Sequence, residues 1–186
     1  MKKFFVMLTL GLAVLTVSNL SALAQNDNPM VGGAAMYRTK DIVDNAVNSA
    51  DHTTLVAAVK AADLVPTLKS KGPFTVFAPT NAAFDKLPAG TVETLLKPEN
   101  KGMLTKVLTY HVVAGNYDSA KLMKLIKRGG GSASLKTVSG GTLMVMMNGN
   151  SIVVRDEKGG TSMVTTANVR QSNGVIHVVD TVLMPN

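Results

Sequence analysis

The sequence contains no cysteine and no tryptophan, and only 4% of its 186 residues are aromatic. Without cysteine, the protein can form neither disulfides nor thiolate metal sites. With so few aromatic rings there is no evident stacking platform for single-stranded nucleic acid, so no nucleic-acid partner is predicted. The chain is instead rich in methionine, with 11 residues, and it carries a formal net charge of +7 at pH 7.

The sequence also lacks the run of about 20 apolar residues that a membrane-spanning helix needs. Its most apolar stretch, residues 4–17, follows Lys2 and Lys3 and precedes a small-x-small triplet that ends at Ala24. This order is typical of a Sec-type signal peptide, so we predict that residues 1–24 are cleaved off. The mature protein is then secreted or periplasmic, and it is not transmembrane.

Cleavage leaves 17 basic and 12 acidic residues, a formal charge of +5. Outside the cytoplasm, this excess suggests anionic polysaccharide, lipopolysaccharide or lipid headgroups as weak partners. Residues 25–38 are rich in small and polar residues with little periodicity, which predicts a flexible leader. The remaining residues, 39–186, have the length of one domain.

The most informative stretch is residues 74–84, Phe-Thr-Val-Phe-Ala-Pro-Thr-Asn-Ala-Ala-Phe. Its first five residues are β-branched, aromatic or small and predict a buried strand. Pro79 has no N–H for a ladder, so the strand should end there, and Thr80 can cap a short helix. Asn81 lies at this corner, where we expect its amide to tie the corner to a neighbouring backbone segment. The alternative is an exposed turn residue.

Helical spacing dominates the rest of the first half of the chain. Helices are predicted from Thr39, from Asp51 or Thr53, near Pro66, over 91–96, from Pro98 and from Asp118. The helix from Pro98 is expected to lead directly into a strand that begins at Tyr110.

The period changes to two after the loop predicted at residues 129–134. Strands are predicted over 135–138, 143–147, 152–155, 163–169 and 175–183. Asn148-Gly149 and Asn173-Gly174 lie between apolar runs and predict hairpins. The fold class is therefore α+β, with a mainly helical N-terminal half around one strand, an antiparallel C-terminal half, and helices packed against a sheet or sandwich.

No catalytic or metal-binding pattern is present. The three histidines, His52, His111 and His177, belong to different predicted elements, and neither an H-E-x-x-H nor a G-x-S-x-G motif occurs. We therefore predict no metal site, no cofactor and no enzymatic activity. An enzyme that uses His111 or His177 is the third hypothesis, after the two functions given below.

Methionines cluster in the run 143–147, which is apolar on both faces and predicts burial on both sides. Methionine side chains also line adaptable apolar grooves. The alternative is therefore a hydrophobic groove lined by Met144, Met146 and Met147.

The helix after Asp118 carries a row of cations on its polar side. This row is either a solvated face or an anion-binding patch. It consists of Lys121, Lys124, Lys127 and Arg128.

Three segments in order resemble the motifs of the fasciclin (FAS1) domain family. They are the stretch 74–84, the segment 108–115 that contains Tyr110-His111, and the segment 173–180, Asn-Gly-Val-Ile-His-Val-Val-Asp, followed by the closing residues 182–185. The resemblance covers residues 39–186. It implies a wedge of strands with helices packed against it, and Asn81, His177 and Asp180 lie in its motifs as structural residues.

The resemblance also implies a function. Fasciclin domains are largely non-enzymatic, are secreted or surface-attached, and mediate adhesion to cells or matrix; some bind lipophilic molecules, including carotenoids. Tyr110 and His111 match a motif linked to adhesion, or they form a structural hydrogen-bond pair. We therefore predict a non-enzymatic adhesion protein whose partner is a surface or matrix protein or polysaccharide. The alternative is a carrier of a lipid or carotenoid. A single domain bridges two surfaces only if it forms an oligomer or has two binding faces, which leaves an oligomer open.

Overall fold

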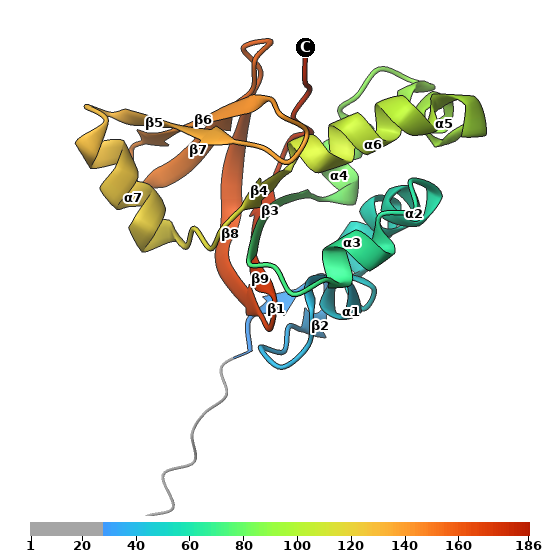
Figure 1. Ribbon diagram of the computed structural model, residues 1–186, viewed down its shortest axis with the longest axis horizontal. Helices are drawn as coiled ribbons and strands as arrows, with labels where there is room; N and C mark the ends of the chain where they lie inside the picture. The colour runs from blue at the N-terminus through green and yellow to red at the C-terminus, as the bar shows by residue number, and fades with distance from the viewer. Residues whose placement is uncertain (1–27) are drawn as a thin grey trace, which may run out of the picture.

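A seven-stranded sheet organises residues 28–186, the part of the chain that the computed structural model describes (Figure 1). The predicted signal peptide lies outside the described residues. The strand order is β4-β3-β9-β8-β7-β6-β5. The strands are β3 (Phe74–Pro79), β4 (Val112–Ala114), β5 (Ser132–Lys136), β6 (Thr142–Asn148), β7 (Ser151–Arg155), β8 (Thr161–Gln171) and β9 (Gly174–Val179).

The pairing confirms the α+β class and adds one feature to it. All neighbouring strands are antiparallel except β3 and β9, which run parallel with Phe74 opposite Gly174 and Pro79 opposite Val179. The strand from the first half of the chain therefore lies inside the sheet that the second half builds. The last strand ends at Val179, not at residue 183, and the N–H of Leu183 donates to Nε2 of His111 instead of joining the sheet.

The helices begin largely at the predicted caps. Thr80 and Asp118 accept hydrogen bonds from the N–H groups three residues ahead, and Asp41 does the same in place of Thr39. The helical elements are α1 (Ile42–Ala46), η1 (Ala50–His52), α2 (Thr53–Ala61), α3 (Val65–Lys69), α4 (Asn81–Asp85), α5 (Thr91–Leu96), η2 (Pro98–Asn100), α6 (Lys101–Tyr110) and α7 (Ser119–Arg128).

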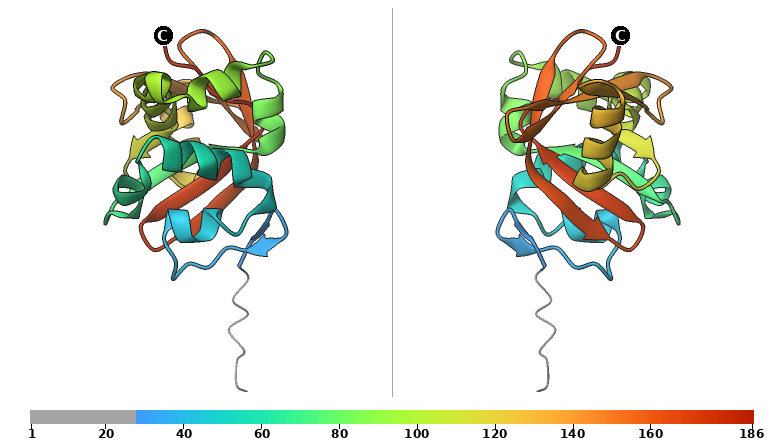
Figure 2. Two further views of the ribbon diagram at one scale, coloured as in Figure 1. Left: turned by 90° about the vertical axis from the view of Figure 1, so that its right-hand side faces the viewer. Right: turned by 90° about the vertical axis from the view of Figure 1, so that its left-hand side faces the viewer.

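Helices cover both faces of the sheet and form two apolar cores. Helices α1, α2 and α3 lie over one side of β3 and β9, and α7 lies on the opposite side of the molecule (Figure 2). Successive side chains of β3 point to opposite faces of the sheet. Val76 and Ala78 therefore pack in the first core, and Phe77 packs in the second. No helix within residues 28–186 is long and apolar enough to cross a membrane.

The predicted flexible leader is wrong for residues 28–38. This segment forms a small hairpin, β1 (Met30–Val31) paired with β2 (Ala34–Ala35), and Val31 and Met36 are buried in the first core. The Ala50 N–H donates to the carbonyl of Gly32 at 3.0 Å, which fastens the hairpin to η1. The apolar residues of this segment show no periodicity, so their burial could not be inferred from the sequence.

The predicted strand from Tyr110 is also corrected. Tyr110 is the last residue of α6, and the His111 N–H still donates to the Leu108 carbonyl at 3.1 Å. The strand begins at Val112. The side chains of Tyr110 and His111 therefore leave a helix end and project into the interior.

Candidate functional site

Tyr110 is fully buried beneath the β5–β6 hairpin. Its hydroxyl donates to the carbonyl of Thr142 at 2.8 Å and accepts from the N–H of Glu157 at 3.0 Å. A Cβ at Gly141 would lie 2.7 Å from the Tyr110 ring, so glycine makes room for the ring here. Burial raises the pKa of Tyr110, which keeps the hydroxyl protonated as a donor. The residue joins α6 to two turns of the sheet.

His111 holds the C-terminal segment against α6. Its Nδ1 donates to the Val107 carbonyl at 2.9 Å, and its Nε2 accepts from the Leu183 N–H at 3.0 Å. Because Nε2 is an acceptor here, the ring is neutral. Burial lowers the pKa of His111 to about 4, against the opposing effects of the Val107 carbonyl and the charge of Asp156. Both side chains of the Tyr-His pair are engaged within the fold, so neither faces a partner directly.

His177 lies on β9 and is also fully buried. Its Nε2 donates to the Tyr117 carbonyl at 2.7 Å, its Nδ1 faces the Asn168 N–H at 3.4 Å, and its ring stacks on Phe77 with 5.7 Å between centroids. Burial lowers the pKa of His177 despite the Tyr117 carbonyl and Asp118. Among residues 28–186, no group of three or more histidine or acidic side chains is placed to hold a metal ion.

Asn81 links the corner after β3 to the start of α2. Its carbonyl oxygen accepts from the Thr54 N–H at 3.0 Å, and its amide nitrogen donates to the Ala50 carbonyl at 2.8 Å. The side chain is partly buried. One amide therefore satisfies a donor and an acceptor of the η1–α2 junction.

We expect Asn81→Ala to lower the free energy of unfolding by about 1–3 kcal/mol, because it leaves a backbone donor and acceptor without their partner. Urea unfolding of both proteins measures this difference. Asn116→Ala is the matched control, since Asn116 is exposed and only its backbone carbonyl is engaged among the described contacts. Equal unfolding midpoints for Asn81→Ala and the control would contradict the expected role.

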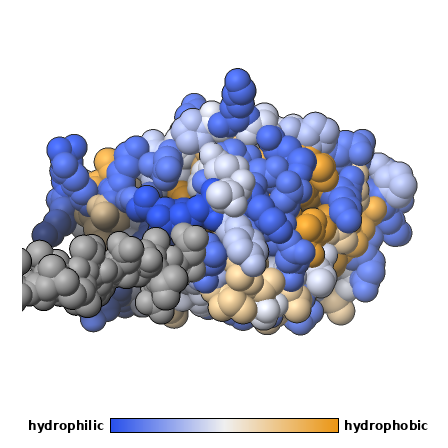
Figure 3. Space-filling model, turned by 90° about the horizontal axis from the view of Figure 1, so that it is seen from below, coloured by the Kyte–Doolittle hydropathy of each residue, from blue (hydrophilic) through white to orange (hydrophobic). Residues whose placement is uncertain are grey.

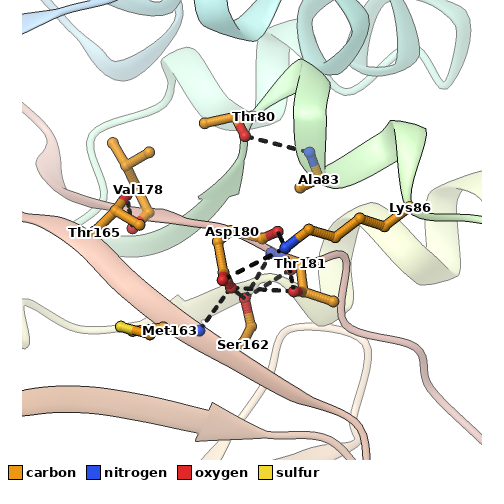
Figure 4. A network of polar contacts seen from close by, with 9 residues as sticks. All are labelled: Thr80, Ala83, Lys86, Ser162, Met163, Thr165, Val178, Asp180 and Thr181. Carbon is orange, nitrogen blue, oxygen red and sulfur yellow. Dashed lines mark hydrogen bonds and ion pairs between the residues drawn. The ribbon is translucent and has the colours of Figure 1, made fainter.

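Asp180 closes the end of β9 with a compact polar network (Figure 4). Its carboxylate accepts from the Met163 N–H at 2.8 Å and lies 3.5 Å from Nζ of Lys86. Burial raises the pKa of Asp180, but these hydrogen bonds and the Lys86 charge outweigh it, so the net shift is downward. The network joins the strand end to α4 and β8 and leaves the carboxylate in a structural role.

The methionine run does not show the two-sided burial predicted for residues 143–147. Leu143 and Val145 are fully buried against α7, whereas Met144 and Met147 are 38% and 36% exposed and Met146 is half-buried. Burial alternates from Thr142 to Val145, where α7 covers one side of β6, and is lost toward the end of the strand, where Met147 is exposed on the same face as Leu143 and Val145. A separate apolar crevice lies elsewhere, and none of these three methionines lines it.

That crevice lies between helices α1–α3 and the sheet. Its volume is about 70 Å³, and its lining is almost entirely apolar. Apolar surface is exposed on the side of the molecule that carries these helices (Figure 3). His52 is a wall residue of the crevice, is 3% exposed, and has its Nδ1 2.8 Å from the Ser49 hydroxyl. Within the described part of the protein its Nε2 makes no hydrogen bond of good geometry. Burial lowers the pKa of His52, and the backbone of Ala78 and the charge of Asp51 oppose this shift.

The polar face of α7 is exposed and basic, as predicted. Lys121 lies with its Nζ 4.3 Å from the Tyr117 ring centroid and donates to the Asn116 carbonyl at 3.1 Å. The N-cap Asp118 pairs with Arg170 at 2.9 Å. A shallow depression lies along this face, lined in part by Lys121, Lys124 and Arg128.

The hydrogen bonds made by two buried side chains, Asn173 and Ser49, were not predicted from the sequence. Asn173 forms the predicted β8–β9 turn, but its side chain also accepts from the Ile42 N–H and donates to the Leu68 and Ser70 carbonyls. The pairing of Ser49 with His52 has a local signal, because the two residues lie three positions apart at a short helical turn.

Comparisons with known proteins agree on one family. The Fasciclin domain model matches residues 50–185. Protein sll1483 of Synechocystis is 42% identical over 175 residues, covering 94% of this chain and 90% of the relative. The immunogenic protein MPB70 of Mycobacterium bovis is 39% identical over 145 residues, covering 75% and 66%. The cell surface glycolipoprotein MPB83 of the same species is 34% identical over 164 residues, covering 85% and 67%.

A solved structure shows the same fold. The FAS1 domain pair of the insect cell adhesion molecule Fasciclin I superposes with a TM-score of 0.70 at 19% identity. The match covers 78% of this chain and 51% of that one, so this chain spans about half the length of the domain pair.

Proposed function

Because this chain belongs to the fasciclin domain family, we propose that it is a non-enzymatic protein that works outside the cytoplasm and adheres to surface or matrix components. The family is generally non-enzymatic. One relative is named a cell surface glycolipoprotein, and the matching structure comes from a cell adhesion molecule. The predicted signal peptide supports the same location.

The observation that carries this proposal is the basic face of α7, formed by Lys121, Lys124, Lys127 and Arg128. The helix contains no acidic residue, and the acid at its N-cap is already paired with Arg170. The helix dipole accounts for Lys127 and Arg128 in the last turn, and Lys121 contacts the Tyr117 ring and the Asn116 carbonyl. Among the described residues, neither explanation applies to Lys124 in the middle of the helix. A structural role therefore explains only part of the charge. The face suits an anionic surface or matrix polysaccharide.

We expect Lys124→Glu/Lys127→Glu to weaken binding to an acidic polysaccharide about 30-fold or more, since each surface cation contributes about 1 kcal/mol to such contacts. Surface plasmon resonance on immobilised heparin and alginate, repeated at rising salt, measures this. Binding of the unmodified protein should weaken with salt because exposed charges are screened.

Lys71→Glu/Lys97→Glu is the control with the same change in net charge. Both lysines are exposed and lie away from α7. If this control weakens binding as much as the α7 variant does, net charge and not the α7 face is responsible. If the unmodified protein binds neither polymer, this polyanion-binding function is rejected.

A second function, the carriage of a small hydrophobic molecule, is favoured by the apolar crevice beneath α1–α3. The methionine groove predicted for this function would lie on β6. The exposed methionines there, Met144 and Met147, point to opposite faces of β6 and line no enclosed space, so the crevice is the better place for an enclosed ligand. Equilibrium binding of xenon, a small apolar probe, followed by NMR, tests this function.

A further inference from the structure

The dipeptide Asn-Gly occurs twice in the chain, and the fold places the two copies in opposite surroundings. Asn148 is the exposed last residue of β6, and Gly149 opens the two-residue turn to β7. Asn173 is only 6% exposed and directly precedes β9. An asparagine before glycine loses its side-chain amide most readily, because glycine has no side chain to hinder attack by its own backbone nitrogen. The surroundings therefore decide which copy reacts.

The reacting groups of the first copy are free and accessible. Asn148 pairs with Ser151 through the backbone, whereas neither its side-chain amide nor the N–H of Gly149 takes part in a hydrogen bond among residues 28–186. A Cβ built on Gly149 would meet no atom within 4 Å, so the space around its nitrogen is open. Nothing in this turn holds the two groups apart.

The second copy is held on both sides of the peptide bond. The side-chain oxygen of Asn173 accepts from the Ile42 N–H, and its nitrogen donates to the carbonyls of Leu68 and Ser70. Gly174 lies in the ladder between β8 and β3, where a Cβ would collide with the backbone of β3. The Asn173 amide therefore cannot turn toward the Gly174 nitrogen while the fold is intact.

We propose that Asn148 is a site of spontaneous deamidation in the folded protein. The Gly149 nitrogen attacks the side-chain carbonyl carbon of Asn148, the bond from that carbon to the amide nitrogen breaks, and ammonia leaves with the Gly149 proton. Water then adds to either carbonyl of the resulting succinimide ring and opens it to aspartate or isoaspartate. No oxidant or reductant takes part. This inference is independent of both proposed functions.

The modification changes the protein at one exposed point. Either product adds a negative charge to a chain with an excess of basic residues. Isoaspartate also adds one carbon to the backbone at position 148, where β6 ends opposite Ser151. Residues 148–150 are all exposed and contribute nothing to either core, so the fold is retained in both products.

The test follows both copies in the same molecule. The purified protein is incubated at mildly alkaline pH, sampled over time and digested with trypsin, which separates the two sites into peptides 137–155 and 171–186. Mass spectrometry with fragmentation locates each deamidated residue and distinguishes aspartate from isoaspartate. We expect Asn148 to convert at least about 100-fold faster than Asn173, since Asn173 reacts only in molecules that have opened.

Two controls show that the fold is responsible. In urea-unfolded protein the two copies should convert at similar rates, because the contacts of Asn173 are lost. Asn148→Gln should abolish conversion at position 148 in the folded protein, since glutamine would have to form a larger ring.

Three results would overturn the proposal. They are equal conversion of Asn148 and Asn173 in the folded protein, conversion of Asn148 only after unfolding, and formation of aspartate without isoaspartate, which would exclude the ring intermediate.

Discussion

Lowering the pH from 7 to 4 is expected to reduce the free energy of unfolding by about 3 kcal/mol through His111 alone. Burial lowers its pKa from 6.5 to about 4 in the folded protein. The unfolded state therefore takes up the proton first as the pH falls. The stabilising contribution is complete above pH 6.5 and is lost progressively between pH 6.5 and 4, at about 1.4 kcal/mol per unit. Urea unfolding at a series of pH values measures it.

His111→Gln isolates this effect, because glutamine offers both a donor and an acceptor but does not titrate in this range. We expect the variant to be less stable at pH 7 and to have a weaker pH dependence between 6.5 and 4. The lowered pKa values of His52 and His177 act in the same direction in both proteins, so the difference between the two curves belongs to His111. Parallel curves would show that His111 does not carry the acid sensitivity.

Phe77→Ala is expected to destabilise the protein by about 3–5 kcal/mol, which is the usual cost of removing a large aromatic side chain from a core. Phe77 is fully buried on β3, between β4 and β9, packs in the second core, and stacks on His177. The deletion leaves a cavity and removes the stacking partner of a buried histidine. Thermal and urea unfolding, followed by circular dichroism, measure the loss.

Phe74→Ala is the matched control, with the same residue type on the same strand. Phe74 is only partly buried, so its truncation should cost clearly less. Equal losses in the free energy of unfolding for the two variants would contradict the deeper burial of Phe77. A loss of less than about 2 kcal/mol for Phe77→Ala would contradict it as well.

The sequence predicts local features of this fold well. The strand at 74–78, the cap at Thr80 and the helix at 91–96 follow from short-range preferences, and the structure has all three. The run Tyr110-His111-Val112-Val113 predicts a strand that begins at Tyr110, whereas α6 continues through Tyr110 in the structure. Helix packing decided that position, as tertiary context often overrides propensity.

Features that depend on contacts between residues far apart in sequence cannot be predicted from local sequence patterns. The burial of Val31 and Met36 needs helices that lie later in the chain, and local composition suggested a leader. The one-sided burial of the methionine run depends on where α7 packs. The Nε2 of His52 makes no hydrogen bond of good geometry within the described residues, and residue spacing does not encode this.

The parallel pairing of β3 with β9 also has a consequence for how the chain is made. It joins residues 74–79 to residues 174–179, so β3 and β4 cannot join the rest of the sheet through β9 until nearly the whole chain has been synthesised. Pairings between segments so far apart in sequence are slow to form, because the intervening loop must be ordered first. A Sec-type signal peptide is predicted for this chain, and Sec export requires an unfolded polypeptide. The late pairing of β3 with β9 keeps the chain unfolded and competent for translocation, so we expect folding to be completed after export.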